Sequence, residues 1–101
     1  MENNQSATAG TTESSDIMIT LKPGQQGIQV ELDSNVKKQF GDHITALITA
    51  VLTRLAIDNV KVEAVDKGAL DCTIKARTIA AVYRLRGQAD YEWEAINSWN
   101  D

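Results

Sequence analysis

The amino-acid sequence predicts an α+β fold: a two-layer sandwich in which two helices lie on one face of a four-stranded, mainly antiparallel sheet. Short segments alternate apolar and polar residues with a period of two, one long segment repeats apolar residues every three or four positions, and glycines separate these segments. The expected element order is strand, strand, helix, strand, strand, helix (ββαββα), with both helices covering the apolar side of the sheet.

The first two strands are predicted from strict alternation. Isoleucine and leucine occupy every second position from Ile17 to Leu21, and Ile28, Val30 and Leu32 repeat the apolar alternation. Pro23, Gly24 and Gly27 interrupt the pattern between these segments. Since proline and glycine favour turns, we expect the two strands to form a hairpin.

A long amphipathic helix is predicted next, from Val36 to Leu55, because its apolar residues recur three and four apart and define one stripe. A second hairpin follows in this interpretation. Its strands cover residues 60–64 and 70–76 and it turns near Gly68, because apolar residues again alternate on both sides. A short helix over residues 77–86 completes the order.

The chain divides into three predicted regions. Residues 1–13 lack Val, Ile, Leu and aromatic side chains, so we expect a flexible N-terminal arm that buries too little surface to order itself. Residues 14–87 contain all predicted helices and strands and form one domain. Residues 88–101 carry two tryptophans and several acidic residues, and are predicted to be an acidic tail.

Composition excludes several classes of function. The formal net charge of −4 and the lack of a basic, aromatic-rich segment argue against nucleic-acid binding. The apolar-rich stretch from Ile44 to Ile57 is too interrupted to span a membrane, and no secretory signal is evident, so we expect a cytoplasmic protein. A single cysteine, Cys72, rules out an intramolecular disulfide and a multi-cysteine metal site.

No self-contained catalytic site can be assembled from the sequence. His43, the only histidine, is predicted to be a helix-surface or half-buried residue beside the apolar stripe, and Cys72 to point inward from a strand. Asp66 and Asp71 flank the predicted second turn, which explains their presence without acid–base chemistry. We therefore expect no catalytic residue and no metal ligand. Ser14 and Ser15, where the arm meets the first strand, would on composition alone be a polar strand edge.

Three segments change that interpretation. "AGTTESSD" (Ala9–Asp16), "KKQFGD" (Lys37–Asp42) and "DKGALDC" (Asp66–Cys72) resemble, in order and spacing, the acyl carrier protein of citrate lyase, its gamma subunit. The resemblance extends over roughly Ala9 to Gly87. It implies a non-catalytic acyl carrier domain, unlike the four-helix carriers of fatty-acid synthesis, that holds acetyl and citryl thioesters during cleavage of citrate to acetate and oxaloacetate.

The resemblance also implies a cofactor and its attachment point. In that family the serine after a glutamate carries 2'-(5''-phosphoribosyl)-3'-dephospho-CoA through a phosphodiester, and here that serine is Ser14. Ser15 is the less favoured alternative, since some members have glycine there. We expect the flexible arm to present this serine to the modifying enzyme.

The same resemblance implies partners and leaves alternatives open. The partners are the alpha subunit (acyl transferase) and beta subunit (lyase) of citrate lyase, with the prosthetic-group transferase and an acetate ligase as transient ones. One alternative is the acyl carrier subunit of malonate decarboxylase, which has a related cofactor. Another is a non-catalytic interaction or regulatory α+β domain in which Ser14 stays unmodified.

Overall fold

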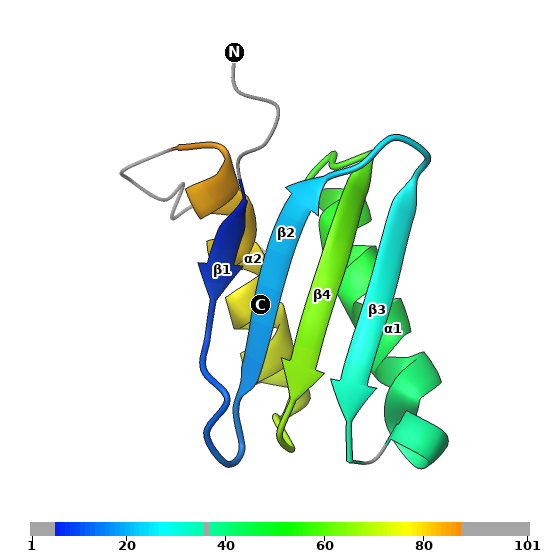
Figure 1. Cartoon of the computed structure of the whole chain (residues 1–101), viewed down its shortest axis with the longest axis vertical. Helices are drawn as coiled ribbons and strands as arrows, with labels where there is room; N and C mark the ends of the chain where they lie inside the picture. The colour runs from blue at the N-terminus through cyan, green and yellow to red at the C-terminus, as the bar shows by residue number, and fades with distance from the viewer. Residues whose placement is uncertain (1–5, 36, 88–101) are drawn as a thin grey trace.

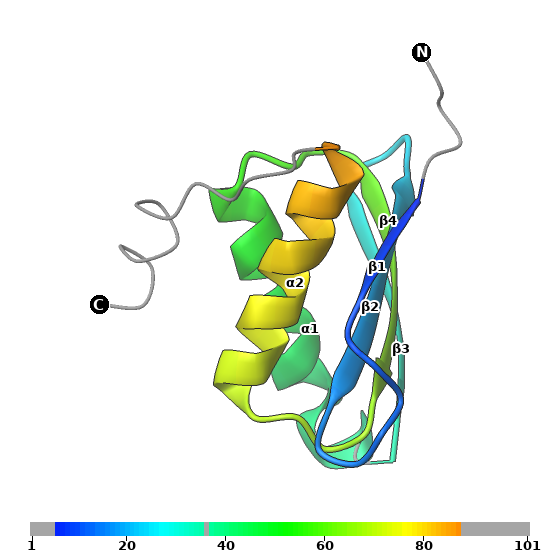
Figure 2. The same cartoon turned by 90° about the vertical axis from the view of Figure 1, so that its left-hand side faces the viewer.

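The computed structural model describes residues 6–35 and 37–87 and forms two layers, a sheet and a pair of helices (Figure 1, Figure 2). The element order is βββαβα. The elements are β1 (Ala7–Ala9), β2 (Ile17–Pro23), β3 (Ile28–Ser34), α1 (Lys37–Arg54), β4 (Val60–Asp66) and α2 (Asp71–Leu85). Both helices cover the same face of the sheet, as Figure 2 shows. The predicted fold class is therefore confirmed, although the fourth strand is not the one expected.

The sheet has the order β1-β2-β4-β3. β2 is antiparallel to both β1 and β4, whereas β3 runs parallel to β4. The prediction of a hairpin between β2 and β3 is thus wrong, because β4 lies between them. The connection of residues 24–27 instead passes over the start of β4, where the carbonyl of Gly27 accepts a hydrogen bond of 3.1 Å from the amide of Val60.

The predicted second hairpin is also wrong. Residues 71–76 form the first half of α2, not a strand, so the helix is longer than the predicted 77–86. The alternation at Leu70 and Cys72 was misleading, because both side chains are exposed. The buried face of α2 follows a helical period instead, and it includes Thr78, whose hydroxyl donates to the carbonyl of Ile74 at 2.8 Å.

The fourth strand comes from the predicted arm. Ala7 and Ala9 are buried and pair with β2, so the expectation of a flexible arm over residues 1–13 does not hold for β1. Their small side chains allow α2 to pack closely over β1, and Arg84 of α2 donates to the carbonyl of Thr8 at 2.6 Å. The predicted tail, residues 88–101, lies outside the described residues.

The core lies between the sheet and the two helices. Side chains of β2 and β4 that point to the same face are buried together with one stripe of each helix, as the alternation in β2 and the stripe in α1 predict. The largest fully buried side chain is that of Tyr83, and the others include Ile17, Ile19, Leu21, Ile48, Leu52, Val62, Ile74 and Val82. None of the helices in residues 6–35 and 37–87 combines the length and the apolar character needed to cross a membrane.

Candidate functional site

Ser14 belongs to the β1–β2 loop, residues 10–16. This loop lies at the end of the molecule where α2 begins (Figure 1, Figure 2). The loop is closed tightly at its base. Gly10 has a φ of +92°, and an added Cβ there would lie 1.9 Å from the carbonyl oxygen of Ile17 and 3.2 Å from Cδ of Arg77. Only glycine fits this position, and the loop is therefore a compact surface loop with its two ends in contact.

The tip of the loop is a four-residue turn from Glu13 to Asp16. The amide of Asp16 donates to the carbonyl of Glu13 at 3.2 Å, which places Ser14 and Ser15 at the two central positions. Ser15 has a φ of +65°. A positive φ at the third residue of a turn is the signature of type II, in which glycine is preferred at that position.

A β-bulge attaches this turn to the sheet. The amide of Ser15 donates to the carbonyl of Lys67 at 2.8 Å, and the amide of Lys67 donates to the carbonyl of Asp16 at 2.8 Å. Two residues of one strand thus oppose one residue of the other, and the first of the two has a positive φ, as in a G1 bulge. Bulges of this kind redirect a side chain next to a functional site.

The turn and the bulge together leave Ser14 at the exposed corner. Across residues 6–35 and 37–87, no hydrogen bond engages its hydroxyl. Ser15 is also exposed, but its amide is bound to the neighbouring strand. The expected flexible segment is therefore replaced here by an ordered loop, in which the residues on both sides of Ser14 are held by hydrogen bonds.

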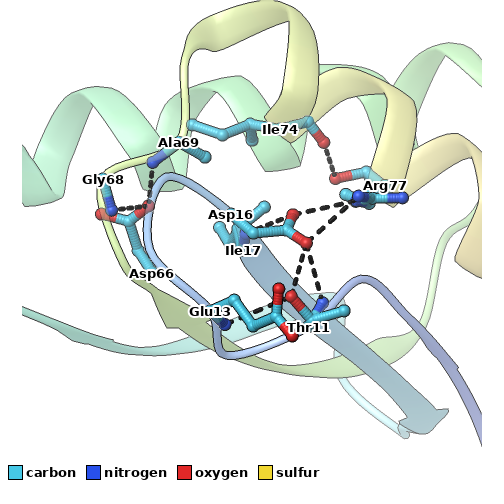
Figure 3. Close-up of polar contacts among 10 residues, drawn as sticks. Thr11, Glu13, Asp16, Ile17, Asp66, Gly68, Ala69, Ile74 and Arg77 are labelled. Atoms are coloured by element: carbon cyan, nitrogen blue, oxygen red, sulfur yellow. Dashed lines mark hydrogen bonds and ion pairs between the residues drawn. The ribbon is translucent and has the colours of Figure 1, made fainter.

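The carboxylate of Asp16 holds the loop together (Figure 3). Its Oδ2 accepts from the hydroxyl of Thr11 at 2.7 Å and from the amide of Thr11 at 3.2 Å, and its Oδ1 accepts from the amide of Ile17 at 2.7 Å. Arg77 of α2 donates to both oxygens, from Nε at 3.0 Å and from Nη2 at 3.1 Å. The loop is thereby bound to the helix layer by a two-pronged ion pair.

These contacts lower the pKa of Asp16. The hydroxyl of Thr11, the guanidinium of Arg77 and the amide of Ile17 all favour the ionised carboxylate, and they hold the pKa of Asp16 well below its usual range. A lowered pKa means that the folded state binds the proton more weakly than the unfolded chain does. The resulting stabilisation is fully present above the unfolded pKa of about 3.9 and is lost as pH falls toward the folded value.

Comparison with Asp16→Asn tests this pH dependence. We expect the difference in the free energy of unfolding between the wild-type chain and Asp16→Asn to be constant above about pH 5, where the unfolded aspartate is ionised. The difference should narrow steadily below about pH 4. Urea unfolding at a series of pH values measures it, and a difference that stays constant down to pH 2.5 would contradict the assigned role of the ionised carboxylate.

Replacement of Ser15 by glycine should stabilise the protein. A non-glycine residue in the left-handed region costs roughly 1–2 kcal/mol, and glycine removes that cost while giving the unfolded chain more freedom, so we expect a net gain of about 0.5–1 kcal/mol. Thermal unfolding of Ser15→Gly measures the gain. Ser15→Ala is the matched control and should leave the melting temperature nearly unchanged. A lower melting temperature for Ser15→Gly would argue against the positive φ.

The other residues considered from the sequence lie elsewhere. His43 is exposed on α1, as predicted, and its Nε2 lies 3.0 Å from both carboxylate oxygens of Asp71 at the start of α2. Cys72 is exposed on α2, so its predicted inward position on a strand is wrong. Asp66 is buried at the end of β4 and, as expected from turn chemistry, accepts from the amides of Gly68 and Ala69 at 3.2 and 3.0 Å.

No cluster of three or more potential metal ligands occurs in the described part of the chain. Sequence reasoning overlooked the three residues that organise the loop, namely Thr11, Asp16 and Arg77. A threonine and an aspartate five residues apart before a strand were a weak local signal for a closed loop. Arg77 lies 61 residues beyond Asp16, and no pattern in a single sequence connects them.

Comparison with known proteins shows that the chain is similar to small carrier subunits of citrate lyase and malonate decarboxylase. Residues 4–85 match the family model described as "ACP: Malonate decarboxylase delta subunit (MdcD)". The chain is 64% identical to the citrate lyase acyl carrier protein of Latilactobacillus sakei subsp. sakei, with 98% of each chain covered. It is 61% identical to the citrate lyase acyl carrier protein of Streptococcus equi subsp. zooepidemicus, with 99% of each covered.

Two solved structures share the fold. One is a Pseudomonas malonate decarboxylase hetero-tetramer in complex with malonate, with a TM-score of 0.56, 22% identity, and coverage of 82% of this chain and 86% of that one. The other is a homoserine kinase from Cytophaga hutchinsonii, with a TM-score of 0.57, 13% identity, and coverage of 90% of this chain and 38% of that one. At these identities the likeness concerns the fold alone.

Proposed function

This chain belongs to the citrate lyase acyl carrier protein family, and from that premise we propose that Ser14 is the residue through which it carries acyl groups. The chain is the acyl carrier subunit of citrate lyase, a non-catalytic carrier. The observation that supports Ser14 is its place at the exposed corner of an ordered loop, with a hydroxyl that no described residue engages.

The proposed prosthetic group is 2'-(5''-phosphoribosyl)-3'-dephospho-CoA, joined to Ser14 by a phosphodiester. The residues present fit such a group. A serine hydroxyl is a suitable acceptor for a phosphoryl linkage, and the side chain of Ser14 is exposed to solvent. The group supplies a terminal thiol that holds the acyl unit as a thioester, so this chain has to provide attachment and orientation but no acid or base.

The proposed reaction sequence needs two kinds of partner. The alpha subunit of citrate lyase exchanges the acetyl unit on the carrier for a citryl unit and releases acetate, and the beta subunit cleaves the citryl unit, which releases oxaloacetate and leaves an acetyl unit on the carrier. A prosthetic-group transferase and an acetate ligase bind transiently to load the carrier. Tethering of the acyl unit raises its effective concentration at both active sites. The cytoplasmic location remains a prediction.

The acyl carrier subunit of malonate decarboxylase is the second candidate, and the description of the matching family model is the observation in its favour. The chain is 64% identical to a citrate lyase acyl carrier protein but only 22% identical to the malonate decarboxylase structure, which supports the citrate lyase subunit as the first candidate. An interaction or regulatory domain would differ from both, since its Ser14 would stay unmodified.

Reconstitution separates these candidates. The loaded chain is mixed with the alpha and beta subunits of citrate lyase, and oxaloacetate formation from citrate is followed, with unloaded chain as the control. We expect citrate-dependent oxaloacetate only with the loaded chain. Release of carbon dioxide from malonate with malonate decarboxylase subunits, and none of the citrate reaction, would favour the second candidate. Absence of both reactions would contradict a carrier role.

A further inference from the structure

The residues around Ser14 are held on both sides by one connected set of hydrogen bonds. Before it, the amide of Glu13 donates to the hydroxyl of Thr11 at 3.2 Å, and that hydroxyl donates in turn to Asp16 at 2.7 Å. After it, the amide of Ser15 is bound to the carbonyl of Lys67 at 2.8 Å. Asp16 is the common member, since its amide closes the turn and its carboxylate holds both Thr11 and Arg77.

The carboxylate of Asp16 is also better shielded than an ordinary surface acid. Its side chain is 13% exposed, whereas Lys22 and Glu63, which form an ion pair of 3.0 Å between β2 and β4, are 44% and 42% exposed. An exposed pair such as Lys22–Glu63 contributes little to stability. Asp16 instead combines shielding with five hydrogen bonds from two segments of the chain, so its removal loosens the turn that contains Ser14.

An attachment serine on a flexible arm would need none of these features. Here the loop requires glycine at position 10, a positive φ at Ser15 and a shielded carboxylate at Asp16. When an ordered loop binds a partner, the loop backbone is already fixed, so binding carries no entropy cost for ordering it. A partner that recognises the ordered loop therefore loses affinity when the loop is loosened, even though Ser14 itself is unchanged.

We infer that Asp16 is a positioning residue for the loading of Ser14: through Thr11 and Arg77 it holds the Glu13–Asp16 turn in the conformation that the loading enzyme binds. The inference rests on the proposed function of Ser14. The donor in the loading step is a phosphoric anhydride of the prosthetic group. The Oγ–H bond of Ser14 and a P–O anhydride bond of the donor break, and an Oγ–P bond forms. The phosphate-containing leaving group takes the electron pair, and the hydroxyl proton passes to solvent.

Loading kinetics of full-length variants test the inference. The prosthetic-group transferase and its donor are mixed with the wild-type chain, with Asp16→Asn or with Arg77→Gln. The loaded fraction, measured by intact mass over time, gives the kcat of the transferase and its KM for each carrier variant. We expect KM to rise about tenfold or more for Asp16→Asn, with a smaller change in kcat, because binding of the ordered loop is lost. Glu63→Gln breaks the Lys22–Glu63 pair far from the loop and should load like the wild-type chain.

A second pair of variants guards against a folding defect in Asp16→Asn. Thr11→Ser keeps the hydroxyl that joins Glu13 to Asp16, whereas Thr11→Val removes it at nearly constant volume. We expect Thr11→Ser to load normally and Thr11→Val to show a raised KM. Hydrogen exchange at the amide of Ser15 is the independent readout, and it should be faster in Asp16→Asn and Thr11→Val while core amides stay protected.

Two outcomes would overturn the inference. One is an unchanged KM in folded Asp16→Asn and Thr11→Val although Ser15 exchanges faster, which would show that loop order does not matter for loading. The other is unchanged exchange at Ser15, which would show that Asp16 does not hold the turn. A wild-type chain that is never loaded at Ser14 would instead overturn the proposed function, and this inference with it.

Discussion

Replacement of Ser14 by alanine is expected to abolish loading completely while the melting temperature stays within about 1–2 °C of the wild-type value. The hydroxyl is the only atom of the side chain that can accept the phosphoryl linkage, so its removal leaves no attachment point. The side chain is exposed, and no described residue binds its hydroxyl, so its loss should change the free energy of unfolding by less than about 0.5 kcal/mol. Intact mass after incubation with the transferase and thermal unfolding measure the two quantities.

Ser15→Ala is the matched control for this experiment. It removes a neighbouring exposed hydroxyl but leaves the backbone hydrogen bond between Ser15 and Lys67 available. We expect Ser15→Ala to be loaded to the same extent as the wild-type chain. Loading of Ser14→Ala, or failure to load Ser15→Ala with Ser14 still present, would move the attachment point to Ser15.

Replacement of Gly10 by alanine is expected to cause the largest loss of stability of any single change in the β1–β2 loop. An added Cβ would lie 1.9 Å from the carbonyl oxygen of Ile17, far inside van der Waals contact, and the φ of +92° is itself unfavourable for alanine. The strained backbone and the steric overlap together should cost roughly 3–5 kcal/mol. Urea unfolding of the full chain measures this cost.

Gly68→Ala separates strain from overlap. Gly68 has a φ of +94°, close to that of Gly10, but an added Cβ there meets nothing within 4 Å. We expect Gly68→Ala to cost only the backbone strain, about 1–2 kcal/mol. Equal losses for the two variants would show that Gly10 is needed for its backbone angle alone, and that the loop is not closed against Ile17.

The parts of the fold with a strong local pattern could be predicted from the sequence. The alternation of β2 and β4 survives in the structure because each strand buries one face. The stripe of α1 survives from Ile44 to Leu52, but Phe40, which belongs to the predicted stripe, is 51% exposed. β1 could not be found, since a strand of three small residues carries too short a pattern to be recognised, and Ala7 and Ala9 are buried only because α2 packs over them. The predicted pairing of β2 with β3 was wrong because the connection of residues 24–27 passes over β4, which lies between them, and the local turn residues do not distinguish this path from a hairpin turn.

The first half of α2 shows a different limit. Leu70, Cys72 and Ile74 alternate as a strand would, and only the later residues reveal the helical period. Thr78 concealed that period because it is polar by type, although its hydroxyl is satisfied within the helix and its side chain is buried. A polar residue whose side chain is hydrogen-bonded within its own helix can therefore belong to the core, although a hydropathy pattern assigns it to the exposed face.

The position of the proposed attachment serine could be predicted from the sequence, but the geometry around it could not. Ser14 was identified through a resemblance to a family, because composition indicates only a polar strand edge. The turn, the bulge and the role of Asp16 depend on contacts with Lys67 and Arg77, which are distant in the sequence. Tertiary structure brings these residues together, and it orders residues 10–13, which were predicted to belong to a flexible arm, as part of the β1–β2 loop.

The central claim is that Ser14 carries the prosthetic group, and peptide mapping of the protein isolated from its native cells during citrate fermentation tests it most directly. Intact mass is measured first, and tandem mass spectrometry then locates any added group within residues 1–22. We predict an added mass equal to that of the phosphoribosyl-dephospho-CoA group, located on Ser14. An unmodified chain from such cells, or the group on any other residue, would contradict the claim.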